Sequence, residues 1–119
     1  MRIGHIELFV KDPLLSRDFY VGVLGFELVA EQGPEGQPPR FIWLSCGGRE
    51  ILLRPGQPRA VVTYQQAQSG IVLYSDKLEQ TLAELKASGL NINGEDTGCP
   101  CFSDPDGHWW QLVNPEEQH

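Results

Sequence analysis

The sequence predicts a single α+β domain, residues 1–119, built from two βαβββ modules, and three observations predict this fold class. Alternating apolar residues mark short strands around two segments with helical periodicity. The order of strands and helices is the same in both halves of the chain. Aligning Asp12 with Asp76 also aligns Gly25 with Gly89, so the helix ends repeat with the strands. We place the modules at about residues 1–55 and 69–115, joined by a connector at 56–68.

The first module begins with a half-buried strand at residues 3–10, where apolar and polar side chains alternate. Asp12 is a suitable N-cap for the helix that follows, and Pro13 suits the first helical position. Gly25 is expected to end this helix in the left-handed conformation. The predicted apolar stripe of the helix, at four-residue spacing, comprises Leu15, Phe19 and Val23.

Three further strands complete the first module. The first of them is expected at residues 27–31, and the Gly- and Pro-rich residues 33–39 are typical of a loop. Residues 41–45 and 50–54 are predicted to pair as a hairpin around a Cys-Gly-Gly turn, because adjacent glycines favour a tight connection between antiparallel strands.

The second module repeats this order. A strand at 71–74 precedes a helix that Asp76 and Glu79 are expected to cap as a capping box, and Gly89 is expected to end that helix. The apolar positions of the helix are Leu78, Leu82 and Leu85. The three strands that follow are expected near residues 90–94, 99–103 and 108–113.

Composition indicates a cytoplasmic protein that binds neither nucleic acid nor membrane. The formal net charge is −7, whereas nucleic-acid phosphates require a basic surface. No apolar run approaches the roughly 20 residues that span a bilayer, and the N-terminus has no signal-peptide pattern. The three cysteines, an odd number without a secretory context, are expected to be reduced thiols.

The chain resembles the vicinal oxygen chelate superfamily in three runs over about residues 2–115, HIELFVKDPLLSRDFYVGVLGFELV, REILL and DPDGHWWQLVNP. That superfamily holds glyoxalase I, extradiol dioxygenases, fosfomycin-resistance enzymes and bleomycin-resistance proteins. The resemblance implies that the two modules form an open sheet curled around a groove, with the helices outside. It also implies a homodimer, because many members are dimers and some complete their sites across subunits.

Strand alternation divides the side chains between the helix side and the groove. The helix side is expected to receive Ile6, Leu8, Val10, Ile51, Leu53, Phe102, Trp110 and Leu112. The groove is expected to receive His5, Glu7, Phe9, Phe41, Trp43, Ser45, Glu50, Leu52, Arg54, Cys99, Cys101, Trp109, Gln111 and Val113. Among these, the candidate ligand-binding residues are Glu7, Phe9, Phe41, Trp43, Arg54, Cys101 and Trp109. Aromatic rings there suit planar molecules, and acidic groups attract cations.

The resemblance places the metal ligands of metal-dependent members at His5, Glu50, Ser69 and Gln111. Histidine and glutamate are good ligands for a divalent ion. Gln111 stands where a glutamate is usual, and Ser69 offers only a neutral hydroxyl. Such a set carries one negative charge, so we expect either no metal or a weakly held divalent ion.

Two functions stay open at this point. The depleted ligand set favours a protein that binds a small planar or cationic molecule, as the antibiotic-sequestering members do. The alternative is a divalent-metal-dependent lyase, isomerase or dioxygenase acting on vicinal oxygens, in which Glu50 is both ligand and proton shuttle. Without a metal, Glu50 is expected to be solvated or paired with Arg54.

Two further features also have alternatives. Phe9, Phe41, Trp43 and Trp109 suit either a groove wall or a dimer interface. The Cys99-Pro100-Cys101 run suggests a metal or redox site, but without a second cysteine pair it favours two ordinary strand cysteines.

Overall fold

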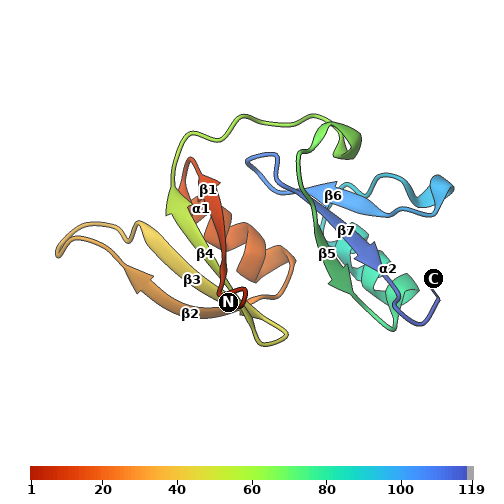
Figure 1. Cartoon of the computed structure of the whole chain (residues 1–119), viewed down its shortest axis with the longest axis horizontal. Coiled ribbons are helices and arrows are strands. Elements are labelled where there is room, and N and C mark those ends of the chain that lie inside the picture. Colours follow the sequence, from red (N-terminus) through yellow and green to blue (C-terminus); the bar gives the residue numbers. More distant parts are fainter. Residues whose placement is uncertain (118–119) are drawn as a thin grey trace. The chain divides into compact units, whose positions relative to one another are not determined.

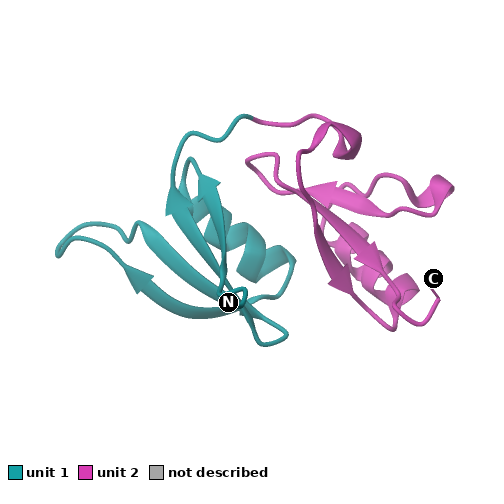
Figure 2. Ribbon diagram, in the orientation of Figure 1, with its two compact units in different colours: residues 1–59 teal, residues 60–119 magenta. Residues whose placement is uncertain are grey.

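The computed structural model describes residues 1–117 and divides into two compact units, residues 1–59 and residues 60–119 (Figure 2). Each unit combines a small open β-sheet with a helix packed on one face (Figure 1). The α+β class and the two-module organisation are therefore confirmed. Residues 60–68, the latter part of the predicted connector, group with the second unit.

The first unit contains a four-stranded sheet. Its strands are β1 (Ile6–Val10), β2 (Glu27–Gln32), β3 (Phe41–Cys46) and β4 (Arg49–Pro55), arranged in the order β1-β4-β3-β2. Strand β1 pairs with β4 in parallel, and the other neighbours are antiparallel. The predicted hairpin between β3 and β4 forms because Gly47 and Gly48 both adopt positive φ angles, 57° and 81°, which a two-residue turn requires.

Helix α1 (Pro13–Asp18) begins as predicted. Asp12 is its N-cap, and the Asp12 carboxylate accepts hydrogen bonds from the backbone N–H groups of Leu14 and Leu15 at 3.1 and 3.2 Å. The helix continues as a π-helical turn, η1 (Phe19–Val23). Gly25 then takes a φ of 76°, which confirms its predicted role at the helix end.

The predicted apolar stripe of this helix is wrong in phase. Leu15 is 57% exposed, whereas Ser16 and Tyr20 are completely buried. Ser16 and Tyr20 have the same four-residue spacing as Leu15 and Phe19, one position further along the chain. The spacing therefore gave the period of the stripe but not its direction, and a small residue lies where the helix meets the sheet.

The second unit contains a three-stranded sheet, one α-helix and two 3₁₀ turns. Its strands are β5 (Ile71–Tyr74), β6 (Cys101–Ser103) and β7 (Trp109–Val113), in the order β5-β7-β6. Helix α2 (Leu78–Ala87) lies on one face, and η2 (Tyr64–Gln66) and η3 (Glu95–Thr97) are 3₁₀ turns. The predicted strand at 90–94 is reduced to an isolated bridge between Asn93 and Cys101.

The start of α2 differs from the predicted capping box. Lys77 is the N-cap, with no side-chain cap bond, and the Ser75 hydroxyl accepts a hydrogen bond from the Lys77 backbone N–H. The rest of the helix follows the prediction, because Leu82 and Leu85 are buried and Gly89 has a φ of 94°. Within residues 1–117, no helix combines the length and apolar character needed to cross a membrane.

Candidate ligand-binding surfaces

The first candidate surface is the face of the first unit's sheet that points away from α1, called here the open face. It carries His5, Glu7, Phe9, Phe41, Trp43, Glu50, Leu52 and Arg54. The alternation that predicts this face is confirmed on the other side of the sheet, where Ile42, Leu44 and Leu53 are completely buried. Strand pairing places Leu52 opposite both Glu7 and Trp43, so Leu52 is buried beneath its neighbours.

A chain of polar contacts crosses the open face. Arg54 Nη1 donates a hydrogen bond to Glu7 Oε1 at 2.8 Å, and Glu7 Oε2 lies 2.9 Å from Nε2 of His5. The hydrogen bond from Arg54, followed by that from His5, holds the pKa of Glu7 below its ordinary value of 4.5. Both carboxylate oxygens of Glu7 are therefore engaged within the unit.

The guanidinium of Arg54 also contacts two of the predicted ligand-binding aromatic residues. Its carbon Cζ lies 5.6 Å from the centre of the Phe9 ring and 5.8 Å from that of Phe41. These separations are within the range of cation–π attraction. Phe9 and Phe41 thus already hold a cation that belongs to the chain itself.

Two contacts fix the orientation of the Trp43 ring. The indole Nε1 donates a hydrogen bond to Oε1 of Gln32 at 3.2 Å, and the His5 ring meets the indole at a centroid distance of 4.7 Å and an angle of 65°. Both contacts fix the orientation of the ring while the side chain stays partly exposed.

Glu50 lies on the open face without a partner. The carboxylate has no hydrogen bond or ion pair to any residue within 1–117, and the residue is exposed. The alternative in which Arg54 pairs with Glu50 is therefore wrong. Register explains the outcome: Phe9 is opposite Arg54, which places Glu7 on the adjacent diagonal within reach of a long side chain.

The predicted metal ligands do not form a metal site within either unit. Parallel pairing of Ile6 with Ile51 brings the preceding residues, His5 and Glu50, next to each other, but Nε2 of His5 is engaged by Glu7. In the second unit Ser69 is exposed. The described part of the chain holds no cluster of three His, Cys, Asp or Glu side chains able to bind an ion. Neither His5 with Glu50 in the first unit nor Ser69 with Gln111 in the second offers enough ligands for a divalent ion by itself.

The two tryptophans of β7 lie on opposite faces, as alternation predicts. Trp110 is completely buried and stacks parallel to Phe102 at a centroid distance of 6.4 Å. Trp109 is also buried, because the connector covers it: its Nε1 donates to the carbonyl of Val61 at 2.8 Å, and the Tyr64 ring lies 6.3 Å away. The sequence gives no signal for this cover, because the connector reads only as a loop.

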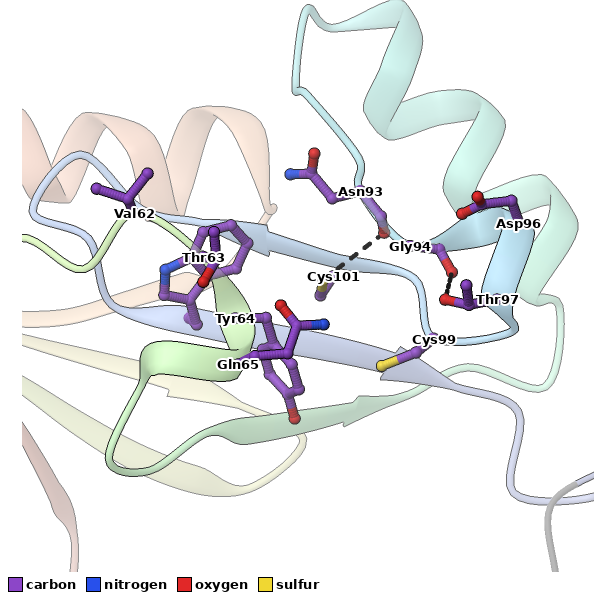
Figure 3. Close-up of a pocket in the computed structure, with 11 residues that line it drawn as sticks. Val62, Thr63, Tyr64, Gln65, Asn93, Gly94, Asp96, Thr97, Cys99 and Cys101 are labelled. Carbon is purple, nitrogen blue, oxygen red and sulfur yellow. Dashed lines mark hydrogen bonds between the residues drawn. The ribbon is translucent and has the colours of Figure 1, made fainter.

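A cavity of about 330 Å³ opens beside Trp109 in the second unit (Figure 3). Its lining includes the predicted residues Cys101 and Trp109, which the structure brings together. It also includes residues that the sequence does not single out, among them Thr63, Tyr64, Asn93 and Asp96. Tyr64 is the most notable of these, because burial, followed by the charges of Cys99 and Cys101, raises its pKa.

Comparison with known proteins agrees with the two-module fold. The model of the Glyoxalase/Bleomycin resistance protein/Dioxygenase superfamily matches residues 2–112, whereas no curated protein matches the chain. The antibiotic binding protein TnmS3 from Streptomyces sp. CB03234 is 27% identical, with a TM-score of 0.70 over 97% of this chain and 98% of that one.

Two further solved structures share the fold at lower identity. The fosfomycin resistance protein FosX from Listeria monocytogenes is 21% identical, with a TM-score of 0.73 over 95% of this chain and 90% of that one. Lactoylglutathione lyase from Agrobacterium tumefaciens is 18% identical, with a TM-score of 0.69 over 97% and 94%.

Proposed function

The chain belongs to the Glyoxalase/Bleomycin resistance protein/Dioxygenase superfamily, and we propose that it binds a small planar or cationic molecule on the open face, without a tight metal site. A planar ring that carries a positive charge suits the two available groups of this face, the Trp43 indole and the Glu50 carboxylate. The ring stacks on Trp43, and the charge pairs with Glu50.

The observation that carries this proposal is the partner choice of Arg54. Arg54 pairs with Glu7 and lies over the rings of Phe9 and Phe41, so these three side chains already have a cationic partner within the unit. Glu50 is left as an exposed carboxylate on the same strand and face. An unpaired carboxylate beside an oriented indole is a suitable arrangement for an aromatic cation.

Two further facts support a binding role. TnmS3, with 27% identity over nearly the whole chain, is an antibiotic binding protein. The net charge of −7 attracts cations to the chain as a whole.

Two probes of similar shape and opposite charge test the proposal. The cation 9-aminoacridine and the anion anthracene-9-carboxylate each have three fused rings, and fluorescence anisotropy reports the binding of either one. We expect the cation to bind more tightly. Glu50→Gln should weaken it about two- to five-fold, as for an exposed ion pair, and Trp43→Leu about three- to thirty-fold.

Glu79→Gln is the matched control, because it removes the same charge from an exposed position in α2. It should leave the affinity for 9-aminoacridine unchanged. Equal weakening by Glu50→Gln and Glu79→Gln would show that only overall charge matters. No binding of either probe, or tighter binding of the anion, would overturn the proposal.

One observation favours a second function, a divalent-metal-dependent lyase, isomerase or dioxygenase. The pairing of β1 with β4 brings His5 and Glu50 together at the strand starts. Titration with Ni²⁺, Zn²⁺, Mn²⁺ and Fe²⁺ separates the two functions. One ion per chain, bound more tightly than micromolar and lost in both His5→Ala and Glu50→Ala, would establish the metal-dependent alternative in place of the binder.

A further inference from the structure

We propose that the cavity of the second unit is a binding site for a soft, thiophilic monovalent cation such as Cu⁺, held by the two thiols of Cys99 and Cys101. Both are free cysteines, and both line this cavity of about 330 Å³ (Figure 3). This site is separate from the open face of the first unit and does not depend on the ligand proposed there.

Hydrogen bonds around the cavity fix the backbone of both cysteines, and the Cys101 thiol donates to the Asn93 carbonyl oxygen at 3.6 Å (Figure 3). Gly94, with a φ of 77°, accepts hydrogen bonds at its carbonyl from the N–H groups of Thr97 and Cys99 at 3.2 and 2.9 Å, which closes a tight loop. Backbone hydrogen bonds of 2.8 Å in both directions join Asn93 to Cys101. The loop and the bridge thus hold Cys99 and Cys101 from two sides.

Any larger residue at Gly94 would disturb this arrangement. A Cβ atom added there would lie 2.2 Å from the Cys99 carbonyl oxygen and 3.6 Å from Sγ of Cys101. The first separation is a severe overlap with backbone. The absence of a side chain at Gly94 therefore allows the loop to approach the two cysteines closely.

The spacing of the two cysteines suits a two-coordinate ion. Because Cys99 and Cys101 are two residues apart in the sequence, their Cα atoms lie at most about 7 Å from each other. Metal–thiolate bonds are about 2.3 Å long, so two sulfurs on one ion lie up to about 4.6 Å apart. Side chains at that spacing can converge to this separation, and soft thiolate ligands select Cu⁺.

Two sulfur ligands are enough for this class of ion, which is why the absence of a three-residue cluster within residues 1–117 does not count against it. The other titratable side chains of the cavity are Tyr64 and Asp96. Burial, followed by the proximity of Cys99, raises the pKa of Cys101.

The binding step balances without an oxidant or reductant. Two S–H bonds break, two metal–sulfur bonds form, and two protons leave to solvent, so the bound complex carries one negative charge. Neither sulfur changes its oxidation state. Metal affinity should accordingly rise with pH, as for other thiolate sites.

Ag⁺ in chloride-free buffer is a redox-stable probe for this site in the reduced protein of residues 1–119. We expect the first equivalent to bind at Cys99 and Cys101, with ultraviolet absorption from the metal–thiolate bonds and release of two protons per ion. Trp109 lines the cavity, so its fluorescence should be quenched in the same step. Cys99→Ser should lower the affinity for the first equivalent of Ag⁺ by about 100-fold or more, because one of the two sulfur ligands is then lost.

Cys46 provides a control within the chain. It is a partly buried thiol of the first unit whose pKa burial also raises, but it has no second cysteine beside it in the sequence. Cys46→Ser should leave the affinity for the first equivalent of Ag⁺ unchanged. In the wild-type protein, one equivalent of Ag⁺ should protect Cys99 from iodoacetamide while Cys46 stays reactive, a measurement that needs no substitution at the buried Cys101.

Two outcomes would overturn the site. The first is that Cys46→Ser and Cys99→Ser lower the affinity for the first equivalent of Ag⁺ equally. That result would indicate that the three thiols bind Ag⁺ independently of one another. The second is that Ag⁺ leaves the alkylation of Cys99 unchanged. Circular dichroism of each variant distinguishes loss of the site from loss of the fold.

Discussion

The Tyr64 hydroxyl donates a hydrogen bond to Oε1 of Gln111 at 3.2 Å. This contact joins the connector to β7, and it occupies the amide oxygen at the position where metal-dependent relatives are expected to carry a ligand. Gly70 allows the approach, because a Cβ there would lie 3.2 Å from the Tyr64 hydroxyl. Gln111 therefore serves the packing of the second unit.

Tyr64→Phe removes that hydroxyl and should lower the free energy of unfolding by about 1 kcal/mol, the usual net value of one hydrogen bond. Urea denaturation followed by tryptophan fluorescence measures it. Tyr74→Phe is the control, because Tyr74 is 73% exposed and no bond of its hydroxyl is seen in the described chain. Equal effects of the two substitutions would contradict the contact.

Gly107→Ala tests the close approach between the DPDG turn and the connector. Gly107 has a φ of 86°, and a Cβ there would lie 2.8 Å from the backbone nitrogen of Val61. Gly36 has a similar φ of 75° with open space around it. Both alanine variants should suffer about 1–2 kcal/mol of backbone strain. Thermal unfolding should show a further loss of about 1–3 kcal/mol at Gly107 alone, from overlap.

The alternation of the first sheet was predictable because one face must be buried, and a period of two then assigns every side chain of β1 and β4. The Gly47-Gly48 turn was predictable for a local reason, its two positive φ angles. Contacts between distant segments were not. Arg54 had two acidic candidates on its face, and only the register of β1 against β4 decides for Glu7.

The repeat between the modules also had a limit. Gly25 and Gly89 both end helices with positive φ, as their alignment predicts. Asp12 caps its helix, whereas Asp76 does not cap the second one. A terminal glycine is required by backbone geometry, while several groups can satisfy a helix start, so only the glycine repeats in function. The homodimer stays a prediction, which sedimentation equilibrium over a range of protein concentrations checks.

The phase of α1 gives a third prediction. Tyr20 is completely buried and Leu15 is 57% exposed. Tyr20→Ala should therefore cost about 3–5 kcal/mol of unfolding free energy, as for other large core residues. Leu15→Ala should cost less than about 1 kcal/mol, as for a surface site. Denaturant titration of both variants decides the matter, and a larger loss at Leu15 would restore the stripe expected from spacing alone.

The lowered pKa of Glu7 makes the stability of the first unit depend on pH. Its folded pKa lies below the ordinary value of 4.5, because Arg54 and then His5 donate hydrogen bonds to the charged carboxylate. A carboxyl whose pKa falls on folding stabilises the protein above its unfolded pKa, and that contribution disappears as pH falls through the folded pKa. The stability difference between wild type and Glu7→Gln should thus shrink below pH 4.5.

Urea denaturation at several pH values from about 5 to about 3 measures this difference. Arg54→Gln removes the hydrogen bond that lowers the pKa of Glu7 most and should flatten the pH dependence of the wild-type protein, while Glu79→Gln, on the surface of α2, should leave it unchanged. If Glu7→Gln and Glu79→Gln alter the pH profile alike, the hydrogen bonds from Arg54 and His5 do not hold the Glu7 carboxylate in solution. If only Glu7→Gln and Arg54→Gln alter it, the internal pairing that leaves Glu50 available for a ligand is present in the free protein.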